Sequence, residues 1–336
     1  MHTCIAETLL HLQLGEPVTF KNLSMFPLLN GVTGSPDYLT LEDALQTNLV
    51  TVSEVHEGGV VNNLKVTNRA PQAVLIVDGE ELIGAKQNRV VNLTILVPAE
   101  QTVVIPVTCV EQGRWHHVSR HFRTSRQAMP STMRARKAEQ VYYRRMTTGE
   151  AYADQYALWD EIAVRQMEMD VHSPTASMAD IYDRFDVTLR DYERAFEPLN
   201  GQVGALFAIN GRIVSMDVFD YVSTFARFFP KLLRGCALDA ISYFQPQFTP
   251  LTMNAVKDFI HRVAHADAQA FPAVGEGEDV RFRAAGVIGA ALVARNRMVH
   301  LCAFTSPDAP NEREDNPFDL FTALSRPSAR WRRHRW

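Results

Sequence analysis

The sequence contains only four cysteines, at positions 4, 109, 236 and 302 of 336, and they lie far apart. No CxxC pair is present, which excludes a zinc knuckle and the disulfide framework of a small secreted domain. Widely separated cysteines are typical of reduced thiols. The sequence therefore favours a cytoplasmic protein.

Long apolar runs are also absent. No stretch reaches the roughly 18 residues that suggest a membrane span. The apolar stretch within residues 1–15 has no basic residue before it, unlike the start of a typical signal peptide. We therefore expect neither a membrane segment nor a signal peptide.

Three common nucleotide and hydrolase motifs are missing as well. The sequence has no GxGxxG, GxxxxGK[ST] or GxSxG pattern. Rossmann, P-loop and hydrolase-elbow sites thereby lose their main support. No cofactor is expected on these grounds.

The charge that is present is unevenly distributed. The net charge is −4, yet residues 116–145 carry eight Arg or Lys against one acid, and residues 326–336 carry five Arg and no acid. An acidic body with two basic segments indicates a localised anionic partner, and nucleic acid is one candidate. The alternative for residues 116–145 is an ordinary solvated helix face.

Turn chemistry predicts several hairpins. Asp78-Gly79 and Asn210-Gly211 each lie between β-branched runs, and glycine tolerates the positive φ of a type I′ turn. A third hairpin is expected over residues 280–304, with its turn near Asn296. Strands are also expected at Val90–Val97 and Thr102–Val110.

Helical spacing of apolar residues predicts a helical block from Phe122 to about Phe196, broken at residues 172–175. Later helices are expected around Phe225–Ala240 and Met253–Ala268, the first with a kink or a fresh start at Pro230.

Together these elements predict an α+β fold with a β-rich, sandwich-like core of antiparallel hairpins. We expect one domain over residues 15–305, with its β-core in 15–120 and 200–305 and a helical insertion at about 122–198. The polar, basic tail, residues 306–336, is expected to be mobile.

A dense polar run follows Val77. If residues 80–89 form one strand, its side chains alternate between two faces. Each face then carries a carboxylate, a cation and an amide, which can hold a phosphate or ribose and still offer an acid or base. The candidate ligand-binding residues here are Glu80, Lys86, Gln87, Asn88 and Arg89, and the candidate catalytic residue is Glu81.

A second polar run, Cys109–Trp115, ends an apolar strand. Glu111 is a candidate acid or base, Arg114 a candidate phosphate clamp, and Trp115 a stacking surface, with Gln112 between them. The alternative is equally open: Trp115 fills the core and Arg114 pairs with Glu111. We expect the two polar runs to converge on one concave site.

Other reactive side chains give weaker signals. His117 and His121 are four residues apart, but two histidines without a third ligand rarely make a metal site, and no metal is expected. Cys109 follows an apolar run, which favours a buried, inert thiol. Lys231 and Arg234 lie opposite an apolar helical stripe, and we expect them to face water.

The two polar runs also carry a family resemblance. Residues 77–89 and 107–115 resemble the signature of the ADP-ribosylglycohydrolase- and rhodanese-phosphatase-associated domain family, an uncharacterised prokaryotic family. Ser173-Pro-Thr175, Phe207–Gly211 and Phe229–Arg234 are similar to it too, and the resemblance runs from about residue 15 to 305.

The resemblance implies a link to ADP-ribose or other NAD-derived metabolites. Two classes of function stay open: an enzyme acting on a phosphate-bearing nucleotide ligand, and a non-catalytic module that senses such a metabolite or recruits a partner protein.

Overall fold

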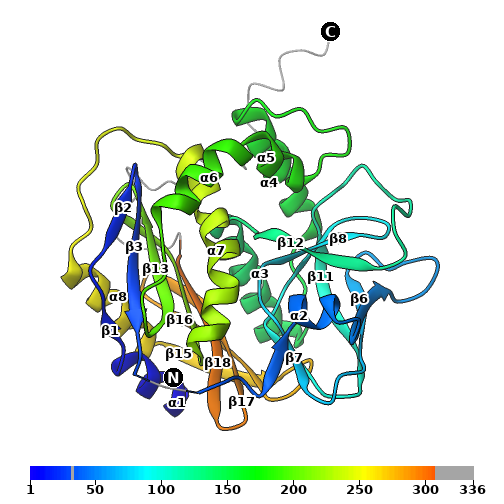
Figure 1. Cartoon of the computed structure of the whole chain (residues 1–336), viewed down its shortest axis with the longest axis horizontal. Helices are drawn as coiled ribbons and strands as arrows, with labels where there is room; N and C mark the ends of the chain where they lie inside the picture. The colour runs from blue at the N-terminus through cyan, green and yellow to red at the C-terminus, as the bar shows by residue number, and fades with distance from the viewer. Residues whose placement is uncertain (32–33, 307–336) are drawn as a thin grey trace.

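Two bodies of β-structure, with helices between and around them, make up the protein (Figure 1). The computed structural model describes residues 1–31 and 34–306. The predicted tail therefore lies almost wholly outside the described residues. Within them, no helix is long and apolar enough to cross a membrane.

The larger body is an antiparallel nine-stranded sheet with the order β1-β3-β13-β14-β18-β17-β16-β15, and β2 pairs with β3 beside this path. Its strands come from both ends of the described chain. They are β1 (Gln13–Leu14), β2 (Val18–Phe20), β3 (Leu23–Leu29), β13 (Gln202–Ile209), β14 (Arg212–Phe219), β15 (Asp267–Pro272), β16 (Glu278–Ala284), β17 (Val287–Ala294) and β18 (Arg297–Thr305).

Two of the predicted hairpins are confirmed in this sheet. β13 and β14 pair up to Ile209 and Arg212 around Asn210-Gly211, and both turn residues have positive φ, 51° and 75°. β17 and β18 turn at Arg295-Asn296, where φ is 53° and 61°. These are the backbone angles that a two-residue I′ turn requires.

The smaller body is a closed barrel with the order β11-β6-β5-β12-β8-β9. A three-stranded sheet, β10-β7-β4, accompanies it. The strands are β4 (Tyr38–Thr40), β5 (Val50–Glu54), β6 (Asn63–Asn68), β7 (Ala73–Ile76), β8 (Glu80–Gly84), β9 (Arg89–Val91), β10 (Ile95–Val97), β11 (Thr102–Cys109) and β12 (Phe122–Ala128). The fold is thus β-rich α+β as predicted, and a closed barrel is one of its two β-bodies.

The hairpin predicted at Asp78-Gly79 is wrong. β7 before this turn pairs with β10 and β4, whereas β8 after it pairs with β9 and β12. Gly79 has the expected positive φ, 85°. Local chemistry therefore identified a turn, but strand pairing depends on partners distant in sequence, and the turn leads from one sheet into another.

The strand predicted over residues 80–89 is also wrong beyond Gly84. Ala85 has a φ of 38°, and a turn carries the chain back into β9 at Arg89. Strict face alternation therefore fails for residues 86–88. The single strand expected at Val90–Val97 is likewise split into β9 and β10.

The helices are α1 (Thr3–Leu10), α2 (Leu41–Gln46), α3 (Ser131–Thr148), α4 (Gln155–Glu168), α5 (Met178–Arg184), α6 (Asp186–Ala195), α7 (Val222–Ser242) and α8 (Met253–Ala264). The helical block begins at Ser131, not at Phe122, because residues 122–128 complete the barrel as β12. α7 runs through Pro230 without a fresh start.

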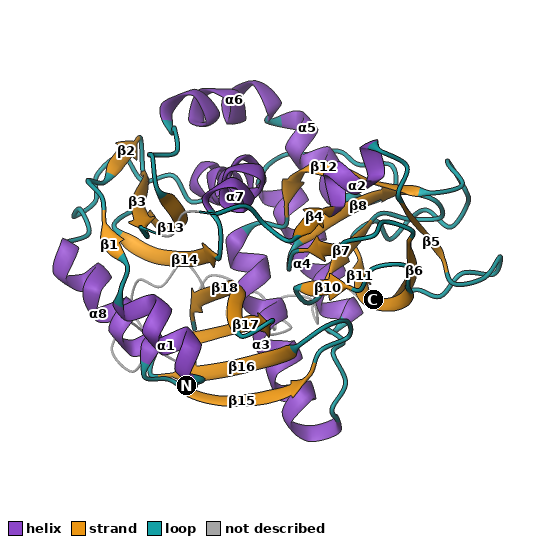
Figure 2. Ribbon diagram, turned by 60° about the horizontal axis from the view of Figure 1, so that its bottom comes forward, coloured by secondary structure: helices purple, strands orange, loops and turns teal. Residues whose placement is uncertain are grey.

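α7 lies between the two β-bodies (Figure 2) and contacts both β12 and β13. A Cβ on Gly235 would lie 2.9 Å from the carbonyl oxygen of Met129, so glycine permits this close helix–strand contact. Phe225, Phe229 and Leu233 of α7 belong to the core on this side of the large sheet, whereas α1 and α8 cover its other face. The barrel has a separate core that includes Val52, Val66 and Leu82.

Candidate functional site

The two polar runs lie in direct contact. The Asn88 backbone N–H donates to Glu111 Oε2 at 3.1 Å, and Arg114 Nη1 donates to the Ala85 carbonyl oxygen at 2.7 Å. Trp115 lies near Lys86, whose Nζ is 5.2 Å from the ring centroid. The barrel therefore brings the two polar runs together, although more than twenty residues separate Asn88 from Glu111 in the sequence.

Arg114 and Glu111 form a buried ion pair. Arg114 Nε and Nη2 donate to the two carboxylate oxygens of Glu111 at 2.8 and 2.6 Å. Its remaining N–H groups reach backbone carbonyls and Asn88 Oδ1. Of the two alternatives for Arg114, the structure shows the pairing with Glu111.

The ion pair also determines the state of Glu111. Burial by itself would raise the pKa of this carboxyl, but Arg114 and the N–H of Asn88 more than offset it and hold the pKa below its usual value. Glu111 is therefore ionised at neutral pH, and its geometry suits positioning of the 84–88 turn better than proton donation.

Replacing Arg114 with alanine is expected to lower the free energy of unfolding by about 3 kcal/mol, since Glu111 would keep a buried charge without its partner. Urea unfolding of the variant measures this. Arg120→Ala is the matched control, because Arg120 is exposed in the same loop and should change stability by less than about 0.5 kcal/mol. Equal stability of both variants would contradict the structural role of Arg114.

Glu80 lies apart from this contact. Lys231 Nζ of α7 donates to its Oε1 at 3.0 Å, and the Val77 N–H donates to its Oε2 at 2.9 Å. Lys231 also pairs with Glu42 of α2 at 3.0 Å. Glu80 thus links the barrel to α7, and the expectation that Lys231 faces water is wrong because these two carboxylates hold it in the interior.

Glu81 points to the other side of β8 and is 1% exposed. Gln127 Nε2 donates to its Oε2 at 2.9 Å, whereas Oε1 has no hydrogen-bond partner among the described residues. Burial raises the pKa of Glu81 to about 7, although the neighbouring Ser125 and Gln127 side chains oppose the shift. This carboxyl therefore exchanges a proton near neutral pH.

A cavity of about 620 Å³ is lined by Gln127, the hydrogen-bond partner of Glu81, although Glu81 itself is not part of the lining. We call it the β12 cavity. Ile83, on the same face of β8 as Glu81, also lines it. The full lining comprises Ile83, Gly84, Asn88, Val118, Ser119, Arg123, Ser125, Arg126, Gln127, Ala179, Asp183, Asp186 and Arg234.

Two of the three arginines that line the β12 cavity form no ion pair with the described residues, although Asp183 and Asp186 also line it. Arg123 and Arg126 of β12 are exposed and form no ion pair with the described residues. Arg234 pairs with Asp186 at 2.9 Å and Glu193 at 2.8 Å, while its buried Nε has no partner in the described part of the chain. The expectation that Arg234 faces water is wrong, because α6 supplies these two carboxylates.

The β12 residues of this cavity were absent from the sequence-based site. β12 has an irregular register against β8 between Thr124 and Ala128, and such a bulge re-aims side chains. The polar run Ser125-Arg126-Gln127 after the buried Phe122 is the available signal, but helical spacing places it in the predicted helical block.

The other predicted ligand residues gather at one end of the barrel. Gln87 Oε1 accepts from Arg89 Nη1 at 3.0 Å and from the Cys109 thiol at 3.1 Å. Trp115 is 45% exposed, and its ring centroid lies 5.6 Å from Arg89 Cζ. Gln112 is exposed, and its backbone carbonyl oxygen accepts a hydrogen bond from Gln87 Nε2 at 3.5 Å. We call Glu54, Lys86, Gln87, Arg89 and Trp115 the barrel-end cluster.

His117 and His121 are exposed. Within residues 1–31 and 34–306, no group of three or more His, Cys, Asp or Glu side chains has the arrangement of a metal site.

Part of the basic segment 116–145 is internal. Arg134 Nη2 donates to Asp217 at 2.7 Å, and Asp78 pairs with both Arg134 and Lys137. Arg134 and Lys137 are each 2% exposed. These two cations of α3 neither form a solvated face nor reach an external nucleic acid.

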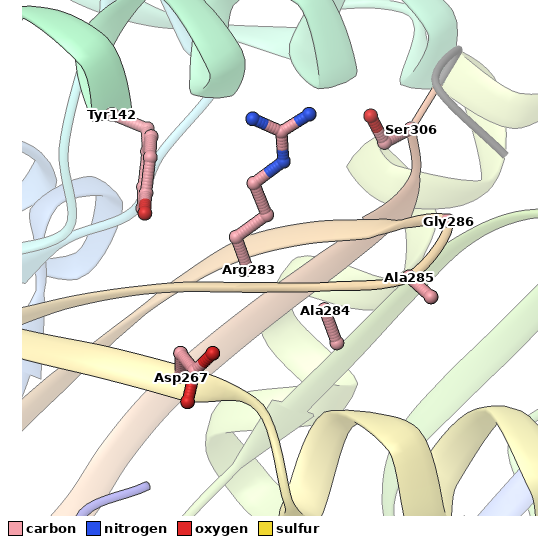
Figure 3. A pocket seen from close by; sticks show the side chains of 7 residues that line it. All are labelled: Tyr142, Asp267, Arg283, Ala284, Ala285, Gly286 and Ser306. Atoms are coloured by element: carbon pink, nitrogen blue, oxygen red, sulfur yellow. The ribbon is translucent and has the colours of Figure 1, made fainter.

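A second cavity, of about 360 Å³, lies at the edge of the large sheet and is lined by Tyr142, Asp267, Arg283, Ala284, Ala285, Gly286 and Ser306. In Figure 3 the Arg283 side chain extends between Tyr142 and Ser306. Its lining includes no residue of the two polar runs, so it is separate from the predicted site.

Fold and site together define a β-rich α+β protein with a closed barrel and a charged cavity beside a protonatable buried carboxyl. The chain belongs to the family described as the ARG and Rhodanese-Phosphatase-superfamily-associated Protein domain, whose model matches residues 11–304. This confirms the resemblance found in the two polar runs. Searches of curated proteins and of solved structures gave no match.

Proposed function

We propose that this protein binds a phosphate-bearing, ADP-ribose-type metabolite in the β12 cavity and uses Glu81 as a proton donor and acceptor. The observation that carries the proposal is the state of Glu81: a buried carboxyl with one oxygen unpartnered and a pKa of about 7. General acid–base catalysts work best with a pKa near the operating pH.

The size and charge of the cavity support such a ligand. Its volume of about 620 Å³ falls within the range of small-molecule sites, about 300–1,000 Å³. Arg123 and Arg126 can each donate a fork of N–H groups to phosphate oxygens. Asp183 lines the same cavity, and burial, together with the neighbouring Asp180 and Asp186, raises its pKa.

Glu81 would act on the bond next to the bound phosphate or ribose. In its protonated form it donates to a leaving-group oxygen, and in its ionised form it accepts a proton from water. Glu111 contributes indirectly, because it binds the backbone of Asn88, whose side chain lines the cavity. In this proposal Glu111 is a positioning residue.

The family description supports the same ligand class, since it names an association with ARG proteins and with the rhodanese-phosphatase superfamily. The word "associated" also supports a second candidate: a non-catalytic module that senses the metabolite and recruits a partner protein. Both candidates require the cavity to bind the ligand, and only the first requires proton transfer by Glu81.

Calorimetry with ADP-ribose, NAD and AMP tests the binding. Arg123→Gln combined with Arg126→Gln is expected to weaken binding by about 1.5–3 kcal/mol, the usual worth of hydrogen bonds to a charged group. Arg120→Gln is the matched control, because it removes the same charge from the same segment but does not line the cavity. No binding by the wild type at millimolar ligand would refute the proposal.

Glu81→Gln separates the two candidates. It keeps the shape of the side chain but cannot exchange a proton at neutral pH, so we expect nearly unchanged affinity and no turnover. Product release is followed by chromatography of the incubated nucleotide. Binding without turnover by the wild type would favour the sensing module.

A further inference from the structure

Arg89, at the start of β9, has donors that no described residue satisfies. It is 0% exposed, and its neighbours in register are Leu82 of β8 and Cys109 of β11. Nη1 donates to Gln87 Oε1 at 3.0 Å and to the Asn88 carbonyl oxygen at 3.4 Å. Nε and Nη2 have no hydrogen-bond partner among the described residues. Unpaired buried donors are costly and call for a missing acceptor.

The two unsatisfied atoms belong to one edge of the guanidinium, the edge that binds two oxygens side by side. Other arginines of this chain bind a carboxylate through this same edge. Arg114 Nε and Nη2 hold Glu111 at 2.8 and 2.6 Å, and Arg295 Nε and Nη2 hold Glu276 at 2.9 and 3.0 Å. Arg89 therefore presents a bidentate oxyanion edge with no carboxylate of the described chain on it.

The surroundings of Arg89 also favour an anion. Lys86 lies in the same barrel-end cluster, with its Nζ 5.2 Å from the Trp115 ring centroid. The counter-charge is Glu54, whose Oε1 accepts from the Lys86 backbone N–H at 3.3 Å and whose Oε2 has no partner in the described part of the chain. Two cations face one carboxylate, so one further negative charge would balance the cluster.

We propose that the barrel-end cluster is a second binding site, one that takes the phosphate or carboxylate group of a small molecule on Arg89 Nε and Nη2. An oxyanion that keeps one proton, such as hydrogen phosphate, also supplies a donor for Glu54 Oε2. Trp115 lies over Arg89 at 5.6 Å from Cζ and is 45% exposed. It must therefore move aside when the ligand enters.

This site is distinct from the β12 cavity. Ile83 of β8 lines the β12 cavity, and Glu81 lies on the same face of the strand. Leu82, in register with Arg89, belongs instead to the barrel core. Because successive side chains of a strand point to opposite faces, the two sites occupy opposite sides of one barrel wall. The inference stands whether or not the β12 cavity binds a nucleotide.

Thermal unfolding with sodium phosphate tests the inference, with sodium chloride at equal ionic strength as the salt control. The parent is Arg123→Gln/Arg126→Gln, so that phosphate in the β12 cavity does not contribute. We expect phosphate to raise the melting temperature of the parent by a few degrees. The same parent carrying Arg89→Met should show no rise, and without phosphate it should be at least as stable, because an unpaired buried cation is gone.

Arg89→Lys gives a second test, which does not require that the Arg89→Met variant folds. It keeps the charge but lacks the bidentate edge, so phosphate affinity should fall about tenfold or more.

Trp115 fluorescence should respond to phosphate in the parent, and Trp115→Phe should remove that response. Equal phosphate stabilisation of the parent and both Arg89 variants, or a crystal structure in phosphate with only water on Nε and Nη2, would overturn the inference. Inorganic phosphate and acetate, tested side by side, distinguish a phosphate from a carboxylate ligand.

Discussion

Replacing Asp239 with alanine is expected to lower the free energy of unfolding by about 3–5 kcal/mol. Asp239 of α7 is 0% exposed and accepts from Arg165 Nη1 at 2.6 Å. It also accepts from the Ser131 hydroxyl at 2.6 Å and from the Thr132 N–H at 2.9 Å, in the first turn of α3. Since the N-cap Pro130 makes no side-chain cap, Asp239 caps α3 from another helix.

Urea unfolding of Asp239→Ala measures this effect. Asp191→Ala on α6 is the control, because Asp191 is half exposed (49%) and its removal should cost less than about 0.5 kcal/mol. The double variant Asp239→Val/Arg165→Met should recover part of the loss, since no uncompensated buried charge remains. A loss of under about 1 kcal/mol in Asp239→Ala would show that Arg165 finds other partners.

The second large effect is a pH dependence that Glu81 imposes on stability. Burial raises its pKa in the folded protein from 4.5 to about 7. Between these values the folded protein keeps the proton that the unfolded chain has lost, so stability falls as the pH rises through this window. Above pH about 7 the ionised Glu81 should cost about 3 kcal/mol.

Glu81→Gln is therefore expected to be more stable than the wild type at pH 8 by about 2–3 kcal/mol and nearly equal to it at pH 4.5. Denaturant unfolding at several pH values measures the difference. Glu197→Gln, an exposed carboxyl in the loop after α6, should change stability by less than about 0.5 kcal/mol at every pH. A difference between Glu81→Gln and the wild type that stays constant from pH 4.5 to 8 would show that Glu81 ionises as it does in the unfolded chain.

The candidate site could be predicted only in part from the sequence. The sequence singles out residues 80–89 and 111–115 because dense polar runs next to apolar strands are unusual. Ala85 and Asn88 do contact residues 111–115, whereas Glu80 and Glu81 lie apart from them. Their individual roles did not follow from residue type. Glu80 and Glu81 are adjacent and chemically alike, yet Glu80 is paired with Lys231 and Glu81 keeps a free oxygen beside a cavity.

Of the residues that line the β12 cavity, Asn88 alone belongs to the site predicted from the sequence. Arg123 and Arg126 lie in a stretch whose polar spacing resembles an amphipathic helix, and its pairing with β8 depends on a strand about forty residues earlier. The local pattern predicts that Arg234 faces water, because the carboxylates that pair with it belong to another helix. Charges that are balanced by remote partners leave no local pattern.

The sequence by itself determined the β-rich α+β class, the hairpins at Asn210-Gly211 and Asn296, and the family, because these depend on turn angles, residue periodicity and long motifs that are local in the chain. Only the tertiary structure decided that Asp78-Gly79 joins two sheets, that β12 closes a barrel, and that Arg114 is paired whereas one edge of Arg89 is not. Strand partners, burial and counter-ions come from residues distant in sequence. The pKa of Glu81 and the free donors of Arg89 are consequences of that assembly.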